Sequence, residues 1–202
     1  MDIEVLTTMQ THSNICNHIH LPVQSGSDKI LKAMNRQHSR EEYLNLISNI
    51  KKILPNCGIS QDIITGFPNE TEKDHLDTLS LMELVKYDFG FMFKYSERPG
   101  TLAARKMKDN ITEKVKQRRL SEIIDLQFQH SYKNLSNYKN KLTEILIEKE
   151  SKKSTKFWCG RNEQNIMVVI PKDNYLPGDF VDVLVESNTS TTLIGFAKKK
   201  IK

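Results

Sequence analysis

Hydrophobic residues in the first two-thirds of the chain follow two alternating patterns. Short apolar runs typical of buried strands occupy residues 18–23, 59–65 and 89–95. Between them, apolar residues recur every three to four positions, as in amphipathic helices, in segments that open at Ser39 and Thr71. Each opening hydroxyl is followed three residues later by an acid, Glu42 or Asp74, which is the pattern of a capping box. This alternation predicts an α/β domain whose parallel strands are joined by helical crossovers.

The pattern changes after a long helix that we predict from about residue 112 to residue 138. Four short β-rich runs follow it, with turn residues such as Pro177, Gly178 and Asp179 between them; they cover residues 142–147, 165–170, 180–186 and 191–196. Short strands packed this closely in sequence favour a small closed β-barrel. We therefore predict two domains, residues 1–134 and residues 135–202.

Composition excludes several classes of protein. Hydrophobic residues make up 38% of the 202 positions and charged residues 27%, which is enough apolar surface for a buried core. No apolar run approaches the roughly 18 residues that a membrane span needs. The first ten residues lack the basic start and apolar stretch of a signal peptide. We expect a cytoplasmic protein with no membrane partner.

The net charge of +5 is concentrated near the end of the chain. Residues 135–202 contain 12 Lys and Arg against 8 Asp and Glu. A basic segment of this kind attracts polyanions, so nucleic acid is a candidate partner. From charge alone, solvated lysines on an ordinary surface explain the excess equally well.

The cysteines predict neither a disulfide framework nor a metal site. Cys16, Cys57 and Cys159 lie 41 and 102 residues apart. His18 and His20 alternate onto one face of a strand and could bind a metal, but two histidines without a third ligand more often pack or form hydrogen bonds. We predict no metal-ligating residue.

Candidate ligand-binding residues follow each predicted strand. Ligands of parallel α/β proteins sit at the carboxyl ends of the strands. Polar or glycine-containing loops begin there at Gln24, Thr65 and Tyr95. Each loop taken alone is also compatible with an ordinary turn or helix cap.

Taken together, these loops resemble a known family. Four strings carry the resemblance: residues 20–28 (HLPVQSGSD), 31–36 (LKAMNR), 62–71 (DIITGFPNET) and 95–101 (YSERPGT). They are similar to the methylthiotransferase family of radical S-adenosylmethionine (SAM) enzymes, and most similar to its tRNA-2-methylthio-N6-dimethylallyladenosine synthase branch. The last 65 or so residues resemble the TRAM domain, an RNA-binding β-barrel, through residues 151–154 (SKKS), 160–161 (GR) and 178–183 (GDFVDV).

The resemblance implies a partial radical SAM (β/α) barrel, strands four to six only, followed by a TRAM barrel. It places one wall of the SAM pocket on Gln24, Ser25, Ile64, Thr65, Gly66, Tyr95 and Ser96. One position departs from the family pattern, since Asn69 stands where a glycine is usual. This departure puts the backbone of that turn in question.

The resemblance also implies two [4Fe–4S] clusters, one of which is held by a Cys-x3-Cys-x2-Cys motif. The chain contains neither set of ligands. We therefore expect the carboxyl-terminal portion of a methylthiotransferase, with no catalytic residue identified and no activity by itself. A half-barrel with an open face also predicts poor solubility or self-association.

The resemblance to the tRNA-2-methylthio-N6-dimethylallyladenosine synthase branch implies conversion of N6-isopentenyladenosine at tRNA position 37 to its 2-methylthio derivative, with SAM as radical source and methyl donor. The implied partner is thus tRNA at the anticodon loop. Sibling branches that methylthiolate threonylcarbamoyladenosine or a ribosomal aspartate share much of the same pattern. The candidate RNA contacts are Lys152, Lys153, Lys156 and Arg161, interleaved with Phe157 and Trp158. One alternative is a non-catalytic RNA-binding protein that acts through the TRAM-like barrel. Another is a half-enzyme that needs a separately encoded amino-terminal half.

Overall fold

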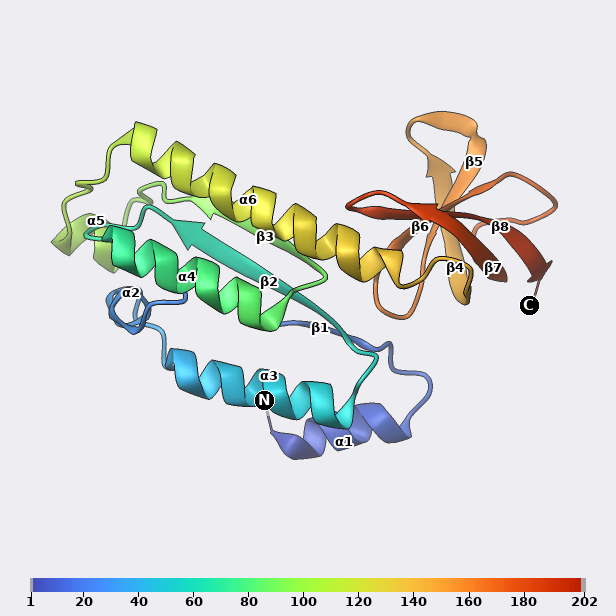
Figure 1. Cartoon of the computed structure of the whole chain (residues 1–202), viewed down its shortest axis with the longest axis horizontal. Helices are drawn as coiled ribbons and strands as arrows, with labels where there is room; N and C mark the ends of the chain where they lie inside the picture. The colour runs from blue at the N-terminus through green and yellow to red at the C-terminus, as the bar shows by residue number, and fades with distance from the viewer. Residues whose placement is uncertain (1, 201–202) are drawn as a thin grey trace.

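The computed structural model describes residues 2–200, and the side chains of residues 2–198. It has an α/β unit and a β-barrel, connected by the long helix α6 (Glu113–Ser136), as Figure 1 shows. Helix α6 runs back along the α/β unit and delivers the chain to the barrel. The domain boundary predicted at residues 134/135 falls in the last turn of this helix, and its exact place stays a prediction.

The α/β unit contains a parallel three-stranded sheet in the order β1-β2-β3. Its elements are α1 (Ile3–Thr11), β1 (His18–His20), α2 (Asp28–Ala33), α3 (Arg40–Ile53), β2 (Gly58–Thr65), α4 (Glu72–Val85), β3 (Phe89–Lys94) and α5 (Leu102–Lys106). The predicted β-α-β-α-β order is therefore confirmed. Both predicted capping boxes are present, at Ser39 with Glu42 and at Thr71 with Asp74.

The sheet has one covered face and one open face. Ile19, Ile59 and Ile63 point to the covered face, where they pack in one core cluster with residues of α3, α4 and α6. The strand register places His18, His20 and Ser60 on the other face, together with Phe91 and Phe93 of β3. The phenylalanine side chains are each 54% exposed. The open face is thus the surface that a complete barrel would enclose.

Two features of this unit differ from the sequence prediction. Strand β1 ends at His20 and not at residue 23, because Pro22 has no N–H for the ladder; an isolated bridge from Gln24 to Ile63 resumes the pairing. Helix α1 was not predicted, because its pattern is mostly polar and only Leu6 is fully buried.

The second unit is a closed barrel in the order β4-β5-β6-β8-β7. Its strands are β4 (Leu142–Ser151), β5 (Ser154–Arg161), β6 (Met167–Pro171), β7 (Phe180–Asn188) and β8 (Thr192–Lys200). The predicted barrel is confirmed, but β5 was missed because its first half is mostly exposed and polar. The core is formed by inward-facing aliphatic residues, including Ile145, Val168 and Val181.

The turn between β5 and β6 docks the barrel onto the α/β unit. Asn17 Nδ2 donates to Glu163 Oε2 at 2.9 Å, and Gln164 Nε2 donates to the Asn56 carbonyl at 3.2 Å. A Cβ atom at Gly58 would lie 2.9 Å from the Gln164 carbonyl oxygen, so this close approach requires glycine. The barrel therefore sits at the amino-terminal end of the sheet. Within the described residues, no helix is both long enough and apolar enough to cross a membrane.

Candidate functional site

The three candidate loops meet at the carboxyl edge of the sheet. Gln24 N donates to the Asp62 carbonyl at 2.9 Å, and Ile64 N donates to the Gln24 carbonyl at 3.0 Å. Tyr95 N donates to the Thr65 carbonyl at 2.8 Å. Residues separated by more than 70 positions are thereby joined in one row of backbone hydrogen bonds.

Gln24 and Ser25 differ in the hydrogen bonds that their side chains make. Gln24 has a left-handed backbone (φ 70°), and its amide has no hydrogen-bond partner among the described side chains. The buried Ser25 hydroxyl lies 3.3 Å from Thr78 Oγ1 and accepts a hydrogen bond from Ser27 N at 3.2 Å. The Gln24 side chain is only 6% exposed and its amide has no internal partner in the described part of the chain, whereas Ser25 has internal partners that shape the loop. Both SAM contacts stay predictions.

A buried carboxylate holds the end of β2. Glu70 Oε2 accepts from Gly66 N at 2.6 Å and lies 3.4 Å from Thr65 Oγ1. Arg119 Nη1 donates to the same oxygen at 2.8 Å. Burial raises the pKa of Glu70, while the Gly66 hydrogen bond and the Arg119 charge oppose that rise. Thr65 thus faces inward and Gly66 is buried beside it, while Ile64 is half-buried and Asn69 is the exposed residue of this turn.

Aromatic side chains follow β3 at the same edge. The rings of Tyr95 and Phe67 pack edge to face at a centroid distance of 5.1 Å. Lys116 Nζ lies 5.5 Å from the Tyr95 centroid, and it pairs with Asp109 at 2.5 Å. Burial raises the pKa of Tyr95, so its phenol is neutral near pH 7. Ser96 is exposed beside it.

The structure explains the departure at Asn69. Its φ is 65°, in the left-handed region that glycine enters freely and that asparagine tolerates better than most residues. Asn110 braces the turn, because Asn69 N donates to its Oδ1 at 2.9 Å and its Nδ2 donates to Asn69 Oδ1 at 3.0 Å. Asparagine therefore preserves the backbone that a glycine would give.

The cysteines lie apart, with Cys16 exposed, Cys57 half-buried and Cys159 buried in the barrel. Within the part of the chain that the structure describes, no three His, Cys, Asp or Glu side chains are grouped to hold a metal. His18 Nε2 and His20 Nδ1 instead share the Ser60 hydroxyl, at 3.0 and 2.8 Å. The described residues therefore do not fit a [4Fe–4S] cluster.

The candidate RNA contacts divide into two groups. Lys152 and Lys153 form the exposed β4–β5 turn, and Lys156 is exposed near the start of β5. Arg161 lies at the other end of β5, where its Nη1 donates to the Asn165 carbonyl at 2.8 Å. The structure thus brings the three lysines together and places Arg161 apart from them, near the α/β unit.

Three side chains with polar or charged groups are buried. Trp158 belongs to the barrel core, only 9% exposed, with Lys172 Nζ 4.3 Å above its ring, so it offers no open stacking surface. Lys116 and Arg119 of α6 are buried as well, although both carry a charge. No local pattern announces this burial, since the acid that Arg119 pairs with lies 49 residues away.

Comparison with known proteins identifies the domains to which this sequence is similar. Residues 1–82 match the Radical SAM superfamily model, and residues 137–198 match the TRAM domain model. The chain contains radical SAM and TRAM domain sequence. The resemblance noted from the loops is therefore confirmed, and the loops at Gln24 and Thr65 lie in the part that matches the Radical SAM superfamily.

Several curated relatives share one name, tRNA-2-methylthio-N(6)-dimethylallyladenosine synthase. The relative from Christiangramia forsetii is 63% identical over 195 residues, which cover 96% of this chain and 40% of the relative. The relative from Flavobacterium psychrophilum is 58% identical over 98% of this chain and 41% of its own length. One from Bacteroides fragilis is 49% identical over 96% and 43%. The chain thus spans about 40% of the length of the relatives it matches.

Proposed function

We propose that this chain is the carboxyl-terminal portion of a cytoplasmic tRNA methylthiotransferase. The observation that carries the proposal is the 63% identity, over 96% of the chain, to a relative named tRNA-2-methylthio-N(6)-dimethylallyladenosine synthase. The substrate is then N6-isopentenyladenosine at position 37 of the anticodon loop. The product is its 2-methylthio derivative.

In this proposal the carboxyl edge of the sheet supplies one wall of the SAM pocket. The side-chain amide of Gln24 is free to donate and accept hydrogen bonds. Gly66 supplies the left-handed turn after β2, where Lys116 packs against it, and the centroid of the Tyr95 ring lies 5.5 Å from Lys116 Nζ. Bound SAM would supply the radical and the methyl group. Ser25, Ile64, Thr65 and Ser96 complete the predicted set, and Ser25 and Thr65 hold the loops in shape.

The clusters require cysteines that this chain does not provide. We propose that residues outside this sequence hold both [4Fe–4S] clusters, in the rest of the same protein or in a separately encoded amino-terminal half. The chain by itself is then inactive. Iron and sulfide analysis after anaerobic reconstitution tests this point, because a stoichiometric cluster on this chain would overturn it.

The barrel supplies the tRNA contact through the exposed lysines Lys152, Lys153 and Lys156. A second function, RNA binding without catalysis, is favoured by the closed, self-contained barrel together with the scattered cysteines. Both functions predict that labelled tRNA binds this chain with an affinity that falls as salt rises. Salt-independent binding, or none, would contradict both.

A further inference from the structure

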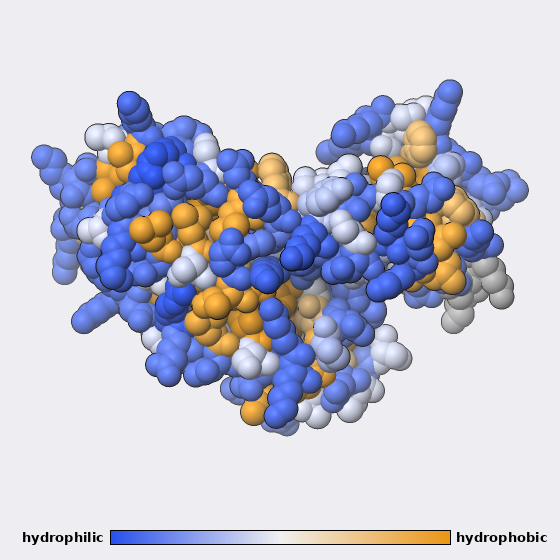
Figure 2. All heavy atoms as spheres, viewed as in Figure 1, coloured by the Kyte–Doolittle hydropathy of each residue, from blue (hydrophilic) through white to orange (hydrophobic). Residues whose placement is uncertain are grey.

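A cavity of about 600 Å³ lies where β3 meets the barrel. Its wall includes Phe89 and Phe91 of β3, Phe128 of α6, and Arg161, Asn165 and Thr191 of the barrel. Figure 2 shows the surface hollowed between the two lobes. The cavity also contacts His18 and Ser60, near the amino-terminal ends of β1 and β2. It is therefore at the opposite end of the strands from the candidate SAM loops.

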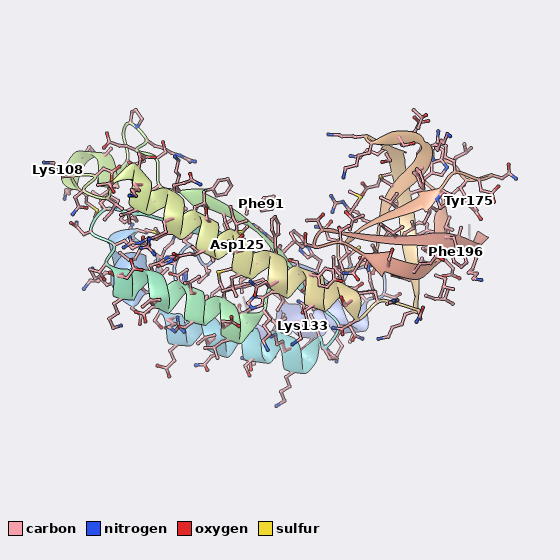
Figure 3. All side chains as sticks on the ribbon, turned by 45° about the horizontal axis from the view of Figure 1, so that its top comes forward. Phe91, Lys108, Asp125, Lys133, Tyr175 and Phe196 are labelled. Atoms are coloured by element: carbon pink, nitrogen blue, oxygen red, sulfur yellow. The ribbon has the colours of Figure 1, made fainter. Side chains whose placement is uncertain are left out.

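One wall of this β3–barrel cavity is aromatic and open to solvent. Phe91 is 54% exposed and Phe128 is 46% exposed, and Figure 3 shows Phe91 beside the middle of α6. Behind them, the rings of His18 and Phe89 are stacked, with centroids 5.3 Å apart and planes 9° apart. Phe91 lies on the sheet face that a complete barrel would enclose, whereas Phe128 lies on α6, away from that face. Two exposed rings that line one concave site of this chain indicate a ligand with a flat apolar face.

The opposite wall is polar and positively charged. Arg161 keeps Nη2 without a partner among the described residues, since Nη1 bonds to Asn165 and Nε lies 3.5 Å from Glu148. Ser190 and Thr191 add hydroxyl groups beside it. Asp88 also lines the cavity, but its half-buried carboxylate is occupied, since it accepts from Ile59 N and Asn134 Nδ2. The accessible charge is therefore that of Arg161.

We propose that the β3–barrel cavity binds an unpaired nucleotide of a single-stranded RNA segment. The base stacks on Phe91 and Phe128, and the phosphate pairs with Arg161. The basic excess of the barrel half, 12 Lys and Arg against 8 Asp and Glu, favours a polyanion over a hydrophobic peptide as the occupant. This inference rests on the proposed function for the identity of the partner, and adds a second contact remote from the β4–β5 turn.

The chain offers a matched pair of variants. Phe91 and Phe93 share one strand, one face of the sheet and the same exposed fraction, but only Phe91 lines the cavity. Binding of a labelled single-stranded RNA to the full chain is measured by fluorescence anisotropy. Phe91→Ala weakens binding roughly tenfold, as loss of one stacked base does, and Phe128→Ala acts in the same direction. Phe93→Ala leaves the affinity within about twofold.

Equal effects of Phe91→Ala and Phe93→Ala would overturn the proposal. An RNA with one abasic position adds a second readout. Where that position occupies the cavity, the wild type loses affinity and Phe91→Ala loses no more. AMP that competes as tightly as the RNA strand would also overturn the proposal, because the cavity would then serve a free nucleotide. Thermal unfolding of each variant confirms that these exposed substitutions leave the fold intact.

Lysine variants separate this inference from the proposed function. Lys152→Gln with Lys153→Gln weakens binding to every RNA and reduces its salt dependence. If the lysine variant loses affinity and Phe91→Ala does not, RNA binding by the barrel stands and the cavity proposal is wrong. If the wild-type chain binds no RNA, both fail.

Discussion

Arg119 and Glu70 form a buried ion pair that ties helix α6 to the turn after β2. Arg119 Nη1 lies 2.8 Å from Glu70 Oε2, and the side chains are 5% and 1% exposed. The same carboxylate oxygen accepts from Gly66 N, so the pair also fixes the backbone of a candidate SAM loop. Its geometry links the stability of the fold to the shape of the site.

Removing one partner of this pair leaves the other charge buried. We expect Arg119→Met to lower the free energy of unfolding by about 3–5 kcal/mol. Arg118→Met is the control, because Arg118 is exposed and its ion pairs with Glu72 and Glu122 contribute about 1 kcal/mol or less. Urea unfolding measures the loss of stability in both variants. Similar losses would show that the buried Arg119–Glu70 pair contributes no more to stability than the exposed ion pairs of Arg118.

Gly66 is expected to resist substitution more than Gly100. Both have positive φ, 74° and 83°, but a Cβ at Gly66 would lie 2.4 Å from Lys116 Cγ, and one at Gly100 meets nothing within 4 Å. Gly100→Ala therefore carries only the backbone strain, about 1 kcal/mol, and Gly66→Ala adds a displaced Lys116. Thermal unfolding should show a larger loss of stability for Gly66→Ala than for Gly100→Ala. The reverse result would contradict the packing at Gly66.

Asp74 predicts a loss of stability in acid. Burial alone would raise its pKa, but hydrogen bonds from Lys29, Thr71 and Ser27 outweigh burial and hold the pKa well below the usual range. A carboxyl with a lowered folded-state pKa stabilises the fold above its unfolded pKa of about 3.9, and this contribution is lost as pH falls toward the folded value. Wild-type stability should fall below about pH 4. The Asp74→Asn variant should be less stable than the wild type at neutral pH and should lose less stability as the pH falls. An equally steep loss in the variant would show that Asp74 is not the group responsible.

The cysteines should differ in reactivity. Burial, followed by the nearby Asp88 charge, raises the pKa of the half-buried Cys57 to about 11, so it has little thiolate at neutral pH. Cys16 is exposed. Iodoacetamide on the folded protein should modify Cys16 first and Cys57 only after unfolding. Fast labelling of Cys57, read by peptide mass spectrometry, would contradict its burial.

The sequence was sufficient for the parts of the fold that local patterns encode. The capping boxes at Ser39 and Thr71 and the alternation of apolar runs located α3, α4 and the three parallel strands. Pro22 could have been used to shorten β1. Strand β5 could not be recognised from its own pattern, because its inward positions occur only in its second half.

The candidate site was less predictable because its contacts are distant in sequence. The loops at Gln24, Thr65 and Tyr95 were found because they follow strands. The buried roles of Glu70 and Arg119 depend on how α6 packs, and neither residue carries a local signal. The β3–barrel cavity was also invisible, since it forms only when the β5–β6 turn docks on the α/β unit.

A chimera tests the central claim most directly. The remainder of the Christiangramia forsetii relative, joined in frame to this chain in place of its own matching segment, would be expressed in a bacterial strain that lacks the endogenous synthase. Mass spectrometry of the tRNA nucleosides should then show the 2-methylthio derivative of N6-isopentenyladenosine with the chimera, and none with this chain alone. A folded, cluster-loaded chimera that forms no such nucleoside would contradict the account.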